Sequence, residues 1–242
     1  MKLKYILRFA LAASLALLVG FGLFSERASA RPHTGSFTMQ FRSFAKNDGS
    51  IQEGVDEYGD PSGCGAKKNS AGNSIFVGDD ARHRSTIGIL DFLTAPLPDG
   101  AYITGAYLQL HVTSFTTRYG NPYDPDIMLG DLYADIAPDP GYYGDFPSLE
   151  TDPGCWGNTD DFTSVYYDMF DYFSYAVHSG DTIFLNFEDP SLIDPTFERT
   201  QIAIYFGNMT NYDNLSQGLK FASGNHPNMS WRPVLTVFYD YP

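Results

Sequence analysis

Two strand-like runs joined by a tight turn, between residues 85 and 112, constrain the fold more than any other feature of this chain. Pro98 and Gly100 lie in the connection, and they favour a turn because proline fixes φ and glycine accepts a positive φ. The two faces of the second run carry Leu108, Leu110 and Val112 on one side and Tyr107, Gln109 and His111 on the other. Alternation with a period of two is typical of a half-buried β-strand.

Similar runs along the chain predict an all-β protein. We expect strands at residues 36–41, 74–77, 86–92, 102–113, 127–136, 182–187, 201–206 and 233–239. We expect loops rich in Gly, Pro, Asn and Asp at residues 47–73, 119–126, 137–161 and 208–217. Residues 165–177 fit either a strand or a short amphipathic helix. Several strands have apolar residues on both faces, which favours a single antiparallel β-sandwich of jelly-roll type over residues 31–242.

The N-terminal residues 1–30 predict export. A basic start, the apolar run 9–24 and the small-residue cleavage pattern Ala28-Ser29-Ala30 are typical of a secretory signal peptide. The alternative is a retained membrane anchor, but the apolar run is shorter than the ~20 residues of a spanning helix. We therefore expect a secreted, extracellular protein that has no membrane attachment after cleavage.

Acidity limits the classes of partner. The whole chain carries a formal net charge of −14, and residues 1–30 hold four basic side chains and one acidic one, so residues 31–242 carry −17. Such a surface repels phosphate backbones, so we expect no nucleic-acid partner. It attracts cations, of which calcium is the one expected outside a cell, although strong acidity also simply maintains solubility.

The chain has only two cysteines, Cys64 and Cys155, and each lies beside glycine in a turn-like setting. In an oxidising compartment a single pair of cysteines usually forms a disulfide. We therefore predict a disulfide between Cys64 and Cys155 that joins two loops and contributes roughly 4 kcal/mol to stability if its geometry is unstrained. The alternative is two free thiols with a catalytic or metal role, and no partner motif accompanies them.

The sequence lacks the common catalytic motifs. It has no Gly-x-Ser-x-Gly elbow, no His-Glu-x-x-His zinc motif and no Gly-rich phosphate loop. Its histidines are scattered without metal-ligand spacing, at His33, His83, His111, His178 and His226. Residues 178–181 contain the residue types of a catalytic triad, but a triad is defined by geometry, and we interpret this run as a turn. We therefore expect that the protein is not an enzyme.

Adjacent acids in one turn suggest a calcium site. Asp79 and Asp80 are the predicted ligands, because calcium is bound by carboxylate and carbonyl oxygens. One alternative is that these side chains form Asx-turns with their own backbone. Another is that they pair with Arg82 and Arg84, which form the densest basic cluster of the chain and could otherwise serve as a basic patch for an anionic glycan.

Three aromatic residues in the loop-rich middle of the chain suggest a sugar-binding surface. Exposed flat rings at Tyr142, Tyr143 and Trp156 could stack on the faces of sugar rings, so these are the predicted carbohydrate-binding residues. The alternative is that they pack beneath the long loops.

Short motifs in a characteristic order support a family resemblance. They are Asp48-Gly49-Ser50-Ile51, Val77-Gly78-Asp79-Asp80-Ala81-Arg82-His83-Arg84, Ile89-Leu90-Asp91-Phe92, Leu97-Pro98-Asp99-Gly100, Arg199-Thr200-Gln201, Phe221-Ala222-Ser223-Gly224 and Trp231-Arg232-Pro233-Val234-Leu235. With these motifs the chain resembles the secreted DNRLRE-type domain family, related to disaggregatase repeats, over nearly all of residues 31–242. The resemblance implies an extracellular jelly-roll sandwich, and some relatives resemble carbohydrate-binding modules for acidic polysaccharides. Domains of this family usually accompany other modules, and we expect no catalytic partner domain for this chain.

Three functions are consistent with these observations. The leading hypothesis is a secreted, non-catalytic binding module for an extracellular polysaccharide, which an exposed aromatic groove would favour. The second is a structural subunit of an extracellular matrix or filament that associates with itself, which a long unpaired edge strand or a loose strand at residues 36–41 would favour. The third is a polysaccharide hydrolase or lyase, which a deep cleft with convergent carboxylates would favour.

Overall fold

The structure is a computed structural model that describes residues 35–55, 58, 61–70, 72–116, 132–136, 178–207 and 214–241, with the backbone alone for residues 55 and 61–70. Its elements in chain order are β1 (Gly35–Arg42), β2 (Gly49–Val55), β3 (Pro61–Ser70), β4 (Ser74–Asp79), β5 (Ser85–Leu93), β6 (Tyr102–Thr116), β7 (Leu132–Ile136), β8 (Thr182–Asn186), η2 (Pro190–Leu192), β9 (Arg199–Phe206), β10 (Gln217–Ala222), η3 (Met229–Trp231) and β11 (Val234–Tyr241). No α-helix occurs among these described residues, so the predicted all-β class is confirmed.

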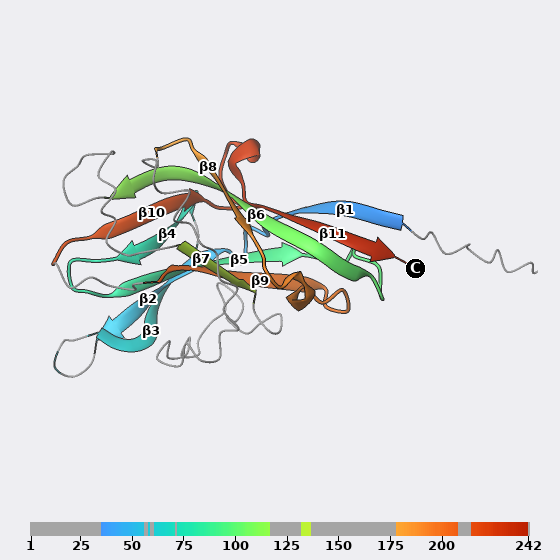
Figure 1. The fold of residues 1–242 in the computed structure, drawn as a ribbon. Helices are drawn as coiled ribbons and strands as arrows, with labels where there is room; N and C mark the ends of the chain where they lie inside the picture. The colour runs from blue at the N-terminus through green and yellow to red at the C-terminus, as the bar shows by residue number, and fades with distance from the viewer. Residues whose placement is uncertain are drawn as a thin grey trace, which may run out of the picture. The chain divides into compact units, whose positions relative to one another are not determined.

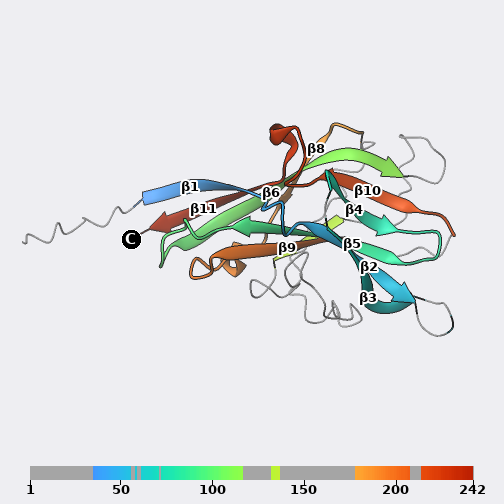
Figure 2. The ribbon, with the colours of Figure 1, turned by 180° about the vertical axis from the view of Figure 1, so that it is seen from behind.

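The strands form two layers that are joined through shared strands. Sheet A consists of β1, β11, β6 and β8, which pair in that order. Sheet B contains β3, β2, β5, β9 and β7, and β4 and β10 link the start of β5 to the end of β6. All of these pairings are antiparallel. Figures 1 and 2 show β10 and β4 lying between β6 of sheet A and β5 of sheet B.

The hydrophobic core lies between the two layers. The burial of β6 alternates from Ala106 to Val112, so one face of this strand enters the core and the other faces outward, as its sequence predicts. Core side chains from sheet A include Leu108, Leu110, Ile183 and Leu235, and those from sheet B include Leu90, Phe92, Ile202 and Ile204. This arrangement is the expected antiparallel β-sandwich, and the jelly-roll type stays a prediction.

Both turns that the sequence suggested are present. The Ala101 N–H donates to the Pro98 carbonyl oxygen at 3.0 Å, and Gly100 has a φ of +81°, so the strands β5 and β6 are joined as expected. Before β8, the Asp181 N–H donates to the His178 carbonyl oxygen at 3.1 Å. Residues 178–181 therefore form a turn, as predicted, in which the His178 Nδ1 lies 3.5 Å from the Asp181 carboxylate.

The prediction of a loop over residues 47–73 is wrong. This segment contains β2 and β3, which pair with each other, and β2 also pairs with β5. β3 has no aliphatic residue larger than alanine, so no hydrophobic alternation marks it as a strand. The predicted strand at residues 127–136 is described only over β7, and residues 165–177 lie outside the described part of the chain.

None of the helical segments in the described ranges has the length and apolar character to cross a bilayer. The predicted signal peptide at residues 1–30 lies outside the described ranges, and export stays a prediction.

Candidate functional site

The outward face of sheet A carries a group of aromatic side chains in contact across three neighbouring strands. The Tyr107 ring, on β6, lies 5.9 Å from the Phe184 ring of β8 and 6.0 Å from the Phe238 ring of β11, measured between centroids. Phe184 and Phe238 are 41% and 38% exposed. Phe238 packs over Gly105, where an added Cβ would lie 3.3 Å from the Phe238 ring. The absence of a side chain at Gly105 therefore leaves room for this ring.

Further along β6, Trp231 lies between two histidines on the same outward face. Its ring stacks on His111 at 4.4 Å and on His226 at 5.1 Å between centroids, with interplanar angles of 28° and 13°. The His111 Nδ1 and the Thr182 hydroxyl of β8 are 2.8 Å apart and share a hydrogen bond. The tryptophan is thereby held against the sheet as a flat, partly exposed ring.

Hydrogen bonds fix the short segment that presents Trp231. The Asn228 side-chain oxygen caps η3 by accepting from the Ser230 N–H at 3.1 Å and from its hydroxyl at 2.8 Å. The Arg42 guanidinium of β1 donates to the Met229 carbonyl oxygen at 2.6 Å, and the Arg232 guanidinium donates to the His226 carbonyl oxygen at 2.8 Å. Trp231 is therefore positioned by contacts from both β1 and its own loop.

We call the six residues Tyr107, Phe184, Phe238, Trp231, His111 and His226 the aromatic face. Polar, uncharged side chains lie among them, and the Gln40 amide donates to the Thr236 hydroxyl oxygen at 3.3 Å. Burial lowers the pKa of His111 below its ordinary value, and the neighbouring His226 lowers it further, while Asp181 opposes this shift. The centre of the aromatic face is therefore uncharged at neutral pH around His111.

The predicted carbohydrate-binding residues Tyr142, Tyr143 and Trp156 lie outside the described part of the chain, so their assignment stays a prediction. The aromatic face is a different set of residues. The alternation along β6 predicts that Tyr107 and His111 lie on its polar side, but it indicates no functional role for either residue. A tyrosine and a histidine on the outward face of one long strand are the signal that could have identified this surface.

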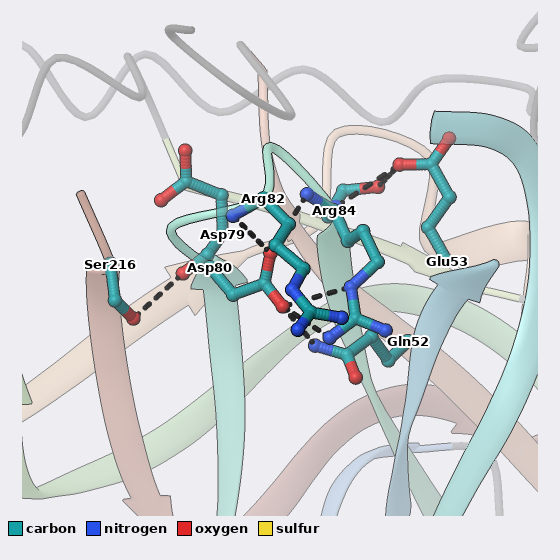
Figure 3. Close-up of polar contacts among 8 residues, drawn as sticks. Gln52, Glu53, Asp79, Asp80, Arg82, Arg84 and Ser216 are labelled. Atoms are coloured by element: carbon teal, nitrogen blue, oxygen red, sulfur yellow. Dashed lines mark hydrogen bonds and ion pairs between the residues drawn. The ribbon is translucent and has the colours of Figure 1, made fainter. Parts of the chain in front are cut away.

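Asp79 is the last residue of β4 and Asp80 follows it, and their carboxylates point in different directions (Figure 3). Asp79 is fully buried, and its Oδ1 accepts from the Gln217 N–H at 3.0 Å. The preceding residue, Gly78, lies opposite Gly218, and an added Cβ on Gly78 would be 2.1 Å from the Gln217 carbonyl oxygen. Close approach of two glycines thus brings β4 and β10 together beside Asp79.

Asp80 closes the turn that leads into β5 (Figure 3). Its Oδ1 accepts from the backbone N–H groups of Arg82 and Arg84 at 2.9 and 3.1 Å, and its Oδ2 accepts from the Arg84 guanidinium Nε at 2.9 Å. Burial alone would raise the pKa of the Asp80 carboxyl, but the hydrogen bonds from Arg84 and Arg82 and the charge of Arg84 together outweigh it and hold the pKa below its ordinary value. The sequence allows two alternatives to a calcium site, a turn formed with the backbone and pairing with an arginine. The structure shows both kinds of contact for Asp80.

Calcium binding at Asp79 and Asp80 stays a prediction. Over the ranges that the structure describes, no three or more His, Cys, Asp or Glu side chains come together in a way that could hold a metal ion. The nearby buried Glu53 accepts from the Ser85 N–H at 3.1 Å and from the Ser85 hydroxyl at 2.9 Å, which ties β2 to the start of β5 (Figure 3). The predicted disulfide also stays a prediction, because Cys155 lies outside the described residues.

A second group of acids forms a buried polar network where β5 meets β9 and the start of β2. Asp91 is fully buried, and its carboxylate accepts from the Arg199 guanidinium on both oxygens, with the Nε–Oδ1 distance at 3.0 Å. It also accepts from the side-chain amides of Asn47 at 3.4 Å and Gln201 at 3.3 Å. This carboxylate is held by a bidentate ion pair between neighbouring strands.

Asp48 lies next to this pair and is also fully buried. Its carboxylate accepts from the Ser43 hydroxyl at 2.8 Å, the Gly224 N–H at 2.7 Å and the Asp91 N–H at 3.3 Å. Burial raises the pKa of Asp48 to about 6, and the three hydrogen bonds only partly oppose this shift. The polar network around Asp48 and Asp91 joins residues from four of the short sequence motifs. Both carboxylates are buried, which indicates a structural role.

A search with this sequence finds no matching protein-family model and no similar curated protein. The resemblance to DNRLRE-type domains therefore stays a prediction, and the chemistry of the described surface carries the functional argument.

Proposed function

We propose that this protein is a secreted, non-catalytic binding module that holds a neutral extracellular polysaccharide against the aromatic face. The observation that carries the proposal is the exposure of contacting rings on the outward side of sheet A, where Trp231 is held between two histidines. Exposed apolar patches rimmed by polar groups mark interaction surfaces. Aromatic rings provide flat apolar contact for the C–H faces of sugars, and the Tyr107 hydroxyl adds a polar group.

The length of the aromatic face suits a polymer. Tyr107 and His111 are four residues apart on β6, which corresponds to about 13 Å along a strand. Phe184 and Phe238 extend the surface across the neighbouring strands, since they contact Tyr107 from either side. A surface of this size accommodates more than one sugar unit of an extended chain.

The charges around the aromatic face favour a neutral ligand. The outward positions of β6 and β8 carry uncharged or histidine side chains, and the guanidinium groups of Arg42 and Arg232 beside η3 donate to backbone carbonyl oxygens. The chain as a whole carries a net charge of −14, which repels an anionic polymer. Gln40, Gln109 and Asn186 offer amides for hydrogen bonds to sugar hydroxyl groups.

Affinity electrophoresis in gels that contain hydroxyethylcellulose, xyloglucan or alginate tests this proposal. We expect retardation by a neutral polymer, and we expect Trp231→Ala and Tyr107→Ala each to weaken binding at least tenfold, or by about 1.4 kcal/mol. Trp231→Phe keeps a flat ring and should retain most of the affinity. Tyr58→Ala is the matched control, because Tyr58 is 81% exposed and lies between β2 and β3.

The melting temperature of each variant separates binding from folding. Loss of binding in Trp231→Ala or Tyr107→Ala with an unchanged melting temperature supports the proposal. Unchanged binding in both variants, or retardation by alginate alone, would show that the aromatic face does not hold a neutral polysaccharide.

A further inference from the structure

The first strand, β1, lies at an edge of sheet A. It pairs with β11 over its whole length, from Gly35 opposite Tyr241 to Arg42 opposite Val234. No other described strand pairs with it, although Ser43 just beyond it forms a bridge to Phe92. An edge strand presents backbone N–H and C=O groups that can pair with another chain (Figure 1).

This edge lacks the features by which proteins usually protect an exposed strand. β1 has eight residues without proline, lysine or an acid, and its only charged side chain is Arg42 at the end. β7 and β8, which are edge strands with described side chains, have five residues each. Proteins limit edge pairing with short strands, bulges, prolines and charges, and β1 has a regular register with β11 and none of these over residues 35–41.

We propose that two copies of this chain pair through β1, antiparallel and related by a two-fold axis normal to sheet A, to give a dimer with one continuous sheet. The axis would pass beside Thr38 or Met39, because these residues lie at the middle of β1, and an axis beside a residue keeps the outward side chains of both copies on the same face. In either register no charged residue lies opposite another, since Gly35 to Phe41 are uncharged and Arg42 lies at each end. The strand is therefore complementary to itself.

The side chains of β1 also favour pairing with a second copy of this chain. Phe37 lies on the same side of β1 as the buried Phe41, yet it is 40% exposed and contacts Tyr239 at 5.6 Å between ring centroids. Pairing about Thr38 would place Phe37 opposite Met39 of the second copy, and pairing about Met39 would place it opposite Phe41. Both arrangements cover an apolar ring that the described residues of one copy leave exposed.

Sedimentation velocity over a range of protein concentrations tests the dimer. We expect the protein to be a dimer, and we expect Thr38→Lys and Thr38→Glu each to raise the dimer dissociation constant at least tenfold, because like charges would lie directly opposite each other in the Thr38 register and diagonally opposite in the Met39 register. An equimolar mixture of the two variants should restore the dimer. Thr104→Lys is the matched control, since Thr104 is exposed on sheet A but lies on the central strand β6.

Restoration in the mixture shows that both variants are folded, so loss of the dimer cannot be mistaken for unfolding. A monomer at all concentrations for the unmutated protein, or a Thr38→Lys dimer as stable as that of the unmutated protein, would overturn the proposal. An open series of larger assemblies would also overturn it, because a two-fold contact closes at two copies.

Discussion

Arg199→Ala is expected to lower the free energy of unfolding by about 3–5 kcal/mol, because the substitution leaves a buried carboxylate without its cation. Asp91, the partner of Arg199, is fully buried, whereas the Arg199 side chain is 22% exposed. The remaining amide contacts from Asn47 and Gln201 do not replace a positive charge. Urea denaturation followed by tryptophan fluorescence measures the difference.

Arg84→Ala provides the matched control for this prediction. Arg84 also pairs with an aspartate, at 2.5 Å from Asp80, but both side chains are partly exposed at 23% and 22%. Partly exposed pairs contribute about 0–1 kcal/mol, so this variant should remain close to the unmutated protein in stability. Equal losses in the two variants would contradict the argument that burial decides the effect.

We expect proton uptake by Asp48 to raise the free energy of unfolding as the pH falls from 7.5 to 4.5. The pKa of Asp48 is about 6 in the folded protein and 3.8 in its ordinary environment, so the folded state takes up the proton first. For an acid with a raised pKa, stability therefore increases as the pH falls through 6, and the full gain is present below 3.8. Between pH 7.5 and 4.5 this contribution amounts to about 2 kcal/mol.

Comparison with Asp48→Asn isolates this contribution. The amide does not titrate, and it loses at least one of the three hydrogen bonds of the carboxylate, so its absolute stability is not the measure. Denaturation of both proteins at several pH values gives the difference in their free energies of unfolding. His111 has a lowered pKa and acts in the opposite direction below pH 6.5 in both proteins, so its contribution cancels in this difference. A difference that does not change with pH would refute the assignment of the proton uptake to Asp48.

Local patterns in the sequence predict much of the sandwich. The alternation in β6 and the turn at Gly100 are sufficient to place a half-buried strand beside another, and both are confirmed. β3 could not be recognised, because its sequence is polar and its strand conformation comes from pairing with β2. Pairing between distant segments is a tertiary effect that a local pattern does not contain.

The candidate site shows the same limit. The outward position of Tyr107 and His111 follows from the period of a strand, but the contacts with Trp231 and Phe238 depend on how β6, β11 and η3 meet in space. Asp48 and Asp91 belong to short motifs that are visible in the sequence itself. In the structure Asp48 and Asp91 are enclosed and joined to Ser43, Gly224 and Arg199, so the residues most visible in the sequence stabilise the fold.

The pairing of Gly35 with Tyr241 has a consequence for protein engineering. Directly opposed residues of antiparallel strands have Cα atoms about 5 Å apart. The sandwich, residues 35–241, therefore begins and ends at nearly the same point. A short peptide could join these ends, and new termini could be opened at the exposed turn that contains Gly100. Such a circular permutant would keep every strand pairing described here, and the unit could equally be inserted into a surface loop of a host protein without separating the ends of that loop.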